Sequence, residues 1–146
     1  MPTGSKLAGA ILFFGVGYFA ALQVLLTLPE GMPATYFPIT IAGIGLWQGW
    51  TVMGARAGEG FGLAVANGTR TSMQIAFFGI MIFALRTMFQ RSGNLRYDSP
   101  GEATVDALNL FLEYSLQSLT VQIWGALLVG GVVGGILTEF AARSWR

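Results

Sequence analysis

The chain has 146 residues, of which 53% are apolar and only 10% carry a charge. A soluble domain usually has about 25% charged residues, so this composition excludes a water-soluble globular protein. Disorder and nucleic-acid binding are excluded as well, because the net charge is +1 and the chain has no basic run. We therefore expect one all-α integral membrane domain that covers residues 1–146.

The sequence contains neither Cys nor His. This removes disulfides, thiolate nucleophiles, the commonest general base and the commonest ligands of metals and haem. A Ser or Thr nucleophile would have no imidazole beside it, and the only lysine is Lys6 near the N-terminus. We therefore expect a protein that is not an enzyme and that holds no metal or cofactor, while contacts with lipid, quinone or pigment stay open.

The first half of the chain predicts two membrane spans. Residues 7–28 are uncharged, and this run is too long for the apolar core of a signal peptide. As a helix rising 1.5 Å per residue, it is long enough to cross a hydrocarbon core of about 30 Å. Prolines and a glycine at residues 29–33 then predict a turn. The second span is expected at residues 38–55, from Pro38 to the residue before Arg56.

The second half predicts two more spans and one amphipathic helix. A polar stretch at residues 67–70 suggests that residues 62–70 lie at the membrane surface and that the third span covers residues 71–89. Residues 102–119 form an amphipathic helical segment, and residues 121–140 form the last span. Four spans put both termini on one side of the membrane. That side has five Lys or Arg residues against three on the other, which favours the cytoplasm for both termini.

Glycines lie inside the predicted spans rather than only in turns. Gly45 and Gly49 are four residues apart, and residues 130–135 contain two overlapping G-x-x-x-G patterns. Small residues at this spacing let two helix backbones approach closely in lipid. We expect Gly45, Gly49, Ala126, Gly130 and Gly134 to be helix-packing positions. The partner is either another helix of this chain or a second membrane protein.

The segment 102–119 carries its acids on one stripe. On a helix, Glu102, Asp106, Asn109, Glu113 and Gln117 share one face, and Val105, Leu108, Leu112, Leu116 and Leu119 share another. Two interpretations are open: an ion-pair stripe neutralised by arginines such as Arg86 and Arg91, or a pathway for protons or cations. Glu113 is expected to lie deepest and, if the stripe is structural, to pair with an arginine such as Arg86 or Arg91. Whether this helix lies at the interface or enters the bilayer also stays open.

Short motifs along nearly the whole chain resemble the TrgA family, small bacterial membrane proteins associated with tellurite resistance. The motifs are Met1-Pro2-Thr3, Gly43-Ile44-Gly45-Leu46 with Gly49-Trp50, Val52-Met53-Gly54-Ala55-Arg56-Ala57-Gly58 with Gly60, Asn67-Gly68, Arg96-Tyr97-Asp98, Glu113-Tyr114, Leu127-Leu128-Val129-Gly130-Gly131, and the ending Ala141-Ala142-Arg143-Ser144-Trp145-Arg146. The resemblance implies a multi-pass protein of the bacterial inner membrane. It implies no reaction, because the family is named for a resistance phenotype.

Three functions fit these features. The first is a non-enzymatic accessory subunit that packs against a larger photosynthetic or respiratory membrane complex, as the G-x-x-x-G faces and the missing catalytic residues suggest. The second is a small transporter or permeability factor behind a tellurite phenotype, with the acidic stripe as its path. The third is an assembly factor that leaves the finished complex. The expected partners are membrane lipids and a larger integral membrane protein, with a homo-oligomer as a further option and no nucleic acid.

Overall fold

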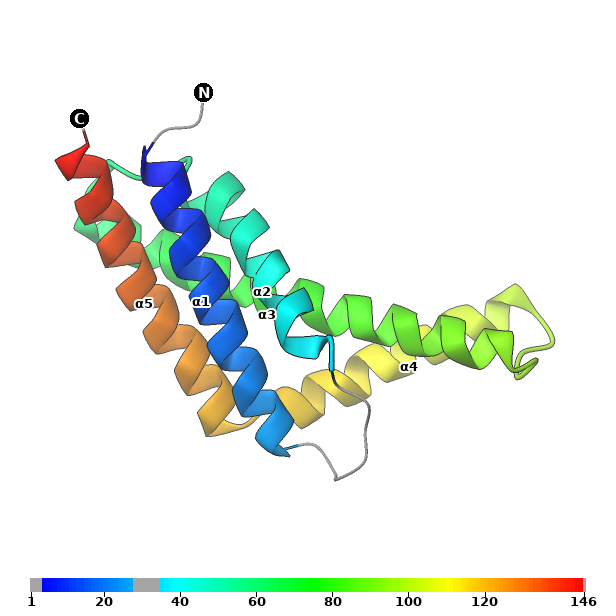
Figure 1. Ribbon diagram of the computed structural model, residues 1–146. Helices are drawn as coiled ribbons and strands as arrows, with labels where there is room; N and C mark the ends of the chain where they lie inside the picture. The colour runs from blue at the N-terminus through cyan, green and yellow to red at the C-terminus, as the bar shows by residue number, and fades with distance from the viewer. Residues whose placement is uncertain (1–3, 28–34, 146) are drawn as a thin grey trace.

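The computed structural model describes residues 4–27 and 35–145, which are mostly helical (Figure 1). In chain order the elements are α1 (Gly4–Thr27), α2 (Phe37–Gln48), the π-helix η1 (Gly49–Met53), α3 (Phe61–Gly93), α4 (Pro100–Ser118) and α5 (Val121–Ser144). The turn predicted at residues 29–33 lies outside the described residues.

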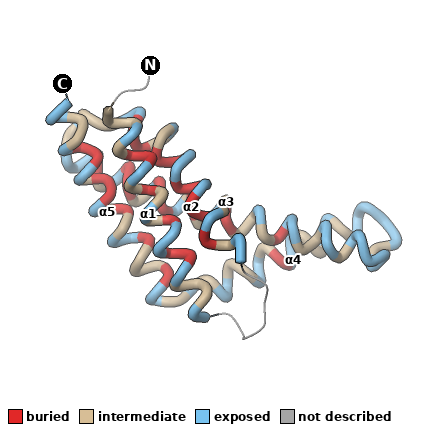
Figure 2. Tube along the Cα trace, viewed as in Figure 1, coloured by how far each residue is buried: buried red, intermediate tan, exposed pale blue. Residues whose placement is uncertain are grey.

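The helices form a bundle from which one helical hairpin projects. The bundle contains α1, α2, α5 and the first half of α3, while the second half of α3 pairs with α4 and, beyond its contacts with α2 at Gly79 and Phe83, leaves the bundle (Figure 1). We call residues 79–118, which comprise the second half of α3, the loop after it and α4, the arm. Figure 2 shows that buried residues gather in the bundle and become sparse along the arm. Helix α4 runs across the direction of α1 and α5 rather than beside them (Figure 1).

Within the described residues, three helices are long and apolar enough to span a membrane: α1, α3 and α5. The second predicted span, residues 38–55, is a 12-residue α-helix that continues as the π-helical turn η1. Pro38 occupies the first turn of α2, and the amide of Gly54 closes η1 by donating to the carbonyl of Gly49 at 2.8 Å. A fourth span therefore stays a prediction.

The predicted surface segment, residues 62–70, and the predicted third span, residues 71–89, belong to one helix. Helix α3 runs unbroken for 33 residues from Phe61 to Gly93. Asn67 and Gly68 are buried against the bundle instead of facing water. Their polarity suggested a break, whereas their small size suits close helix packing. The predicted amphipathic segment and last span correspond to α4 and α5, and α5 continues four residues beyond the expected end.

Two pairs of antiparallel helices touch through their backbones at glycine. Gly45 of α2 lies against the carbonyl of Phe13 on α1, and Gly49 lies against the carbonyl of Gly9. A Cβ atom at Gly9 would lie 2.6 Å from the carbonyl oxygen of Gly49, and one at Gly17 would meet the carbonyl of Ile41 at 2.7 Å. No side chain fits at these positions, so glycine determines how closely α1 and α2 approach.

Helix α5 uses its two overlapping glycine patterns for two different neighbours. Gly131 and Gly135 face the backbone of α3, where they meet Gly68 and Ala64 respectively. Gly130 and Gly134 face side chains of α1 instead. A Cβ atom at Gly130 would lie 2.9 Å from Val16, and one at Gly134 would lie 3.3 Å from the ring of Phe13. Ala126, one turn earlier, is half-buried.

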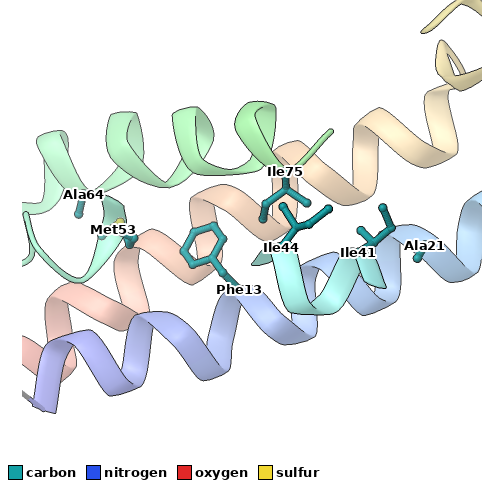
Figure 3. Packing of buried hydrophobic residues seen from close by; sticks show 7 residues of the cluster. All are labelled: Phe13, Ala21, Ile41, Ile44, Met53, Ala64 and Ile75. Atoms are coloured by element: carbon teal, nitrogen blue, oxygen red, sulfur yellow. The ribbon is translucent and has the colours of Figure 1, made fainter. Parts of the chain in front are cut away.

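A small apolar core fills the centre of the bundle (Figure 3). Its members come from α1, α2, η1 and α3: Phe13, Ala21, Ile41, Ile44, Met53, Ala64 and Ile75. Phe13, Met53 and Ile75 are fully buried. Phe13 contacts glycines of both α2 and α5, since its carbonyl meets Gly45 and its ring meets Gly134. It therefore joins α2 and α5 to α1.

The contact between α3 and α5 can be tested with a single methyl group. Gly135→Ala should destabilise the protein by about 1–3 kcal/mol, because the new methyl meets the carbonyl of Ala64, which cannot move without shifting a helix. Gly125→Ala is a matched control on the same helix, since a Cβ there meets nothing within 4 Å. It should leave stability unchanged or raise it by up to about 1 kcal/mol. Thermal unfolding in detergent measures both, and equal losses would rule out a specific glycine contact.

Candidate functional site

The outer end of the arm holds a cluster of three polar side chains from three elements. Arg91 lies in the last turn of α3, Tyr97 in the loop, and Asp106 near the beginning of α4. The Nη1 atom of Arg91 lies 2.9 Å from Oδ1 and 2.8 Å from Oδ2 of Asp106. The Tyr97 hydroxyl donates to the second of these oxygens. One carboxylate thus joins the end of α3, the loop and the beginning of α4.

These contacts shift the ionisation of the cluster. Hydrogen bonds from Tyr97 and Arg91 hold the pKa of Asp106 below its ordinary value of 3.8. Partial burial and the hydrogen bond to Asp106 raise the pKa of Tyr97 above 10.0. At neutral pH, Asp106 is therefore an anion that accepts from two donors, and Tyr97 is a neutral donor. Both groups are engaged in holding the hairpin closed.

The loop before α4 is ordered by a capping box. Ser99 accepts from the amide of Glu102 at 3.3 Å, and the Glu102 carboxylate accepts from the amide of Asp98 at 3.0 Å. Pro100 fills the first helical turn. Beside this cap is an open cavity of about 450 Å³. Its walls comprise Arg96, Tyr97, Ser99, Gly101, Glu102, Val105, Asp106 and Asn109.

Further contacts along the arm pair α4 with α3. The hydroxyls of Thr87 and Tyr114 lie 2.9 Å apart, and the rings of Phe77 and Phe111 meet edge to face at 5.6 Å. Leu110 is the one buried residue of α4. The arm is thus a two-helix unit with an aromatic contact near the bundle. At its outer end Arg91, Tyr97 and Asp106 hold the two helices together, and we call these three residues the clasp.

The second polar site lies at the opposite end of the bundle and is centred on Glu139 of α5. This side chain is fully buried, yet its carboxylate accepts from three donors. The amides of Gly58 and Gly60 donate to it at 2.6 and 3.2 Å, and Nε of Arg143 lies 3.0 Å away. Both glycines have positive φ, a backbone conformation that glycine adopts readily, in the turn whose amides reach the carboxylate. Glu139 therefore fastens the loop that precedes α3 to α5.

Aromatic rings cover this second site. The guanidinium of Arg143 stacks over the ring of Phe61 at 4.3 Å, and Phe61 packs on Phe140 at 5.0 Å. Phe61 is the first residue of α3, so the same residues that shield the ion pair also place the beginning of that helix. Within the described residues, no group of three carboxylates could hold a metal ion.

The structure separates the members of the predicted ion-pair stripe. Arg91 and Asp106 form an ion pair, whereas Glu102 serves the capping box and Arg86 lies exposed beside the ring of Phe83. The expected pairing of Glu113 with Arg86 or Arg91 is wrong. Glu113 is exposed and accepts from Gln117 at 3.3 Å. Of the predicted stripe, Asp106 pairs with Arg91 of α3, whereas Glu113 has no arginine partner among the described residues.

Sequence reasoning missed Glu139 and Tyr97. Glu139 gave a usable signal, since a lone carboxylate near the end of an apolar run, with Arg143 one turn later, is typical of a buried and paired group. Tyr97 gave none, because loop geometry determines its contact with Asp106. Comparison of the chain with protein-family models, curated proteins and solved structures gives no match.

Removing the carboxylate at the buried site should loosen the loop before α3. In Glu139→Gln one carboxylate oxygen becomes an NH₂ group that faces an amide donor, so we expect a loss of roughly 1–3 kcal/mol. Glu59→Gln, at an exposed carboxylate in the same loop, is the control and should change stability by less than about 0.5 kcal/mol. Unfolding in detergent measures both, and an unchanged Glu139→Gln variant would show that the carboxylate is dispensable.

The clasp of the arm should respond to acid. Because its folded-state pKa is lowered, Asp106 stabilises the hairpin above its ordinary pKa of 3.8, and this contribution disappears as the pH falls through the lowered value. At neutral pH, Asp106→Asn should speed amide exchange in the first turns of α4 by roughly three- to fivefold. Asp98→Asn, which removes an exposed charge from the same loop, should not. Mass-spectrometric hydrogen exchange distinguishes them, and equal exchange in both variants contradicts the clasp.

Proposed function

We propose that the protein is a non-enzymatic accessory subunit of the membrane and that its arm docks on a larger integral membrane protein. The TrgA resemblance points to the bacterial inner membrane, and a photosynthetic or respiratory complex is the expected partner. The single observation behind this proposal is the outer face of α4, which is apolar and uncovered.

This face consists of five aliphatic residues at helical spacing, directly opposite the buried Leu110. Their exposed fractions range from 58% to 70%: Val105, Leu108, Leu112, Leu116 and Leu119. We call them the α4 stripe. The stripe is about 21 Å long at 1.5 Å per residue. A projecting helix with a continuous apolar side suits docking of a helix into a hydrophobic groove.

The glycine patterns, which first suggested docking, are used inside the chain. Gly45 and Gly49 contact α1, and Gly130 and Gly134 face α1 side chains. This leaves the arm as the element best suited to reach another protein, because it extends beyond the bundle that the glycines hold together (Figure 1).

The transport hypothesis has less support from the geometry. It needed an acidic path formed by Glu102, Asp106 and Glu113, and these three residues have separate roles. Asp106 binds Arg91 on the α3 side, Glu102 caps α4, and Glu113 faces outward. An assembly factor would use the same docking face as an accessory subunit, but it would not remain in the finished complex.

Photo-cross-linking in native membranes tests the proposal. A photoreactive residue at Leu112 should give an adduct with one larger integral membrane protein that also co-purifies in stoichiometric amount. The same photoreactive amino acid placed at Val129, an equally exposed aliphatic position on α5, should react mainly with lipid. Leu112→Ser should release the partner while changing the stability of the chain itself by no more than about 0.5 kcal/mol.

Two results would contradict the proposal. Lipid adducts alone at both positions would show that no protein covers the α4 stripe. A partner that is captured but never retained through purification would favour the assembly factor.

A further inference from the structure

One side of the α4 stripe is bordered by a carboxylate without a charged partner. Glu113 is exposed and lies next to Leu116, one turn further along the same helix. Its side chain accepts from Gln117, an uncharged group, at 3.3 Å. Asn109 and Gln117, one turn before and after it, continue this polar edge and are exposed as well.

The described arginines of the arm do not neutralise Glu113. Helix α4 contains no Lys or Arg. Arg91 is bound to Asp106, Arg86 lies beside the ring of Phe83, and Arg96 lines the cavity at the outer end of the arm. The charge of Glu113 is therefore tolerated only while water reaches it.

Docking of the α4 stripe would remove that water. When an apolar surface covers Leu112 and Leu116, the carboxylate beside them moves into a region of low dielectric constant, where an unpaired charge is costly. Resting on the proposed function, we infer that the partner presents a lysine or arginine opposite Glu113, beside an apolar groove that accepts the α4 stripe. The ion pair would determine which partner binds and in which register.

The charges on α4 favour a protein over the membrane surface. Helices that lie on membranes usually carry Lys and Arg on the polar face, which attract anionic lipids. The polar side of α4 is acidic instead, with Glu102 and Glu113, so it would repel such a surface. A second copy of α4 would bring only further carboxylates. A basic site on a different membrane protein is the occupant that complements this helix.

The test uses the full chain in its native membrane, with the photoreactive residue at Leu112. Glu113→Arg should lower the yield of the protein adduct about tenfold, and Glu113→Gln about threefold, because the partner's cation then loses its counter-charge. Glu59→Arg makes the same charge reversal at an exposed carboxylate in the loop before α3, and its yield should stay within twofold of the parent. Thermal unfolding in detergent should be the same for all variants.

The possible results separate this inference from the proposed function. A protein adduct whose yield is insensitive to both Glu113 variants overturns the basic site but leaves docking intact. An adduct of twice the chain mass identifies a second copy and overturns the inference. Lipid adducts alone overturn both docking and the basic site. If Glu113→Arg alters folding, the conservative Glu113→Gln variant still decides the question.

Discussion

Backbone contact at glycine determines how this chain packs. Helices in a bilayer gain little from burying apolar side chains against one another, because lipid is equally apolar, so they associate through close van der Waals contact. Here α1 meets α2 at Gly9, Gly17, Gly45 and Gly49, and α3 meets α5 at Gly68, Gly131 and Gly135. The same contacts free the large side chains to face outward, as the many exposed aliphatic and aromatic residues show.

Each polar site uses one carboxylate as the acceptor for donors from other segments of the chain. Loop amides near an apolar bundle need acceptors, and each unmet donor would cost free energy. At Glu139 the chain supplies a carboxylate from α5 to two glycine amides, and Arg143 balances its charge. At Asp106 it supplies a carboxylate to an arginine and a tyrosine, which closes the arm. In both sites one acidic side chain links segments that are far apart in the sequence or separated by a loop.

The length of the apolar runs predicts α1 and α5 well, because an uncharged apolar stretch of about 20 residues is typical of a membrane-spanning helix. It fails at residues 67–70, where local polarity suggests a break and tertiary packing buries Asn67 and Gly68 instead. The periodicity of α4 correctly grouped its leucines, yet it could not say which neighbour each acid meets. Asp106 and Glu113 are seven residues apart, within about 20° of each other around the helix, yet Asp106 meets Arg91 and Tyr97 at the outer end of the arm while Glu113 meets only Gln117. Which side chains form ion pairs depends on how the helices are arranged in space. The periodicity along one helix carries no information about that arrangement.

The continuity of α3 has a mechanical consequence. A single helix of 33 residues is about 50 Å long, and no proline interrupts it. Its first half is clamped against α5 by the contacts at Gly68, and its contacts with α2 continue through Gly79 and Phe83 before it leaves the bundle. A load applied at the outer end of the arm would therefore act as on a lever whose pivot lies where Gly79 and Phe83 rest on α2. The other end of that lever is the loop that Glu139 holds through its amides, so a load from a docked protein would reach the buried carboxylate through the length of α3.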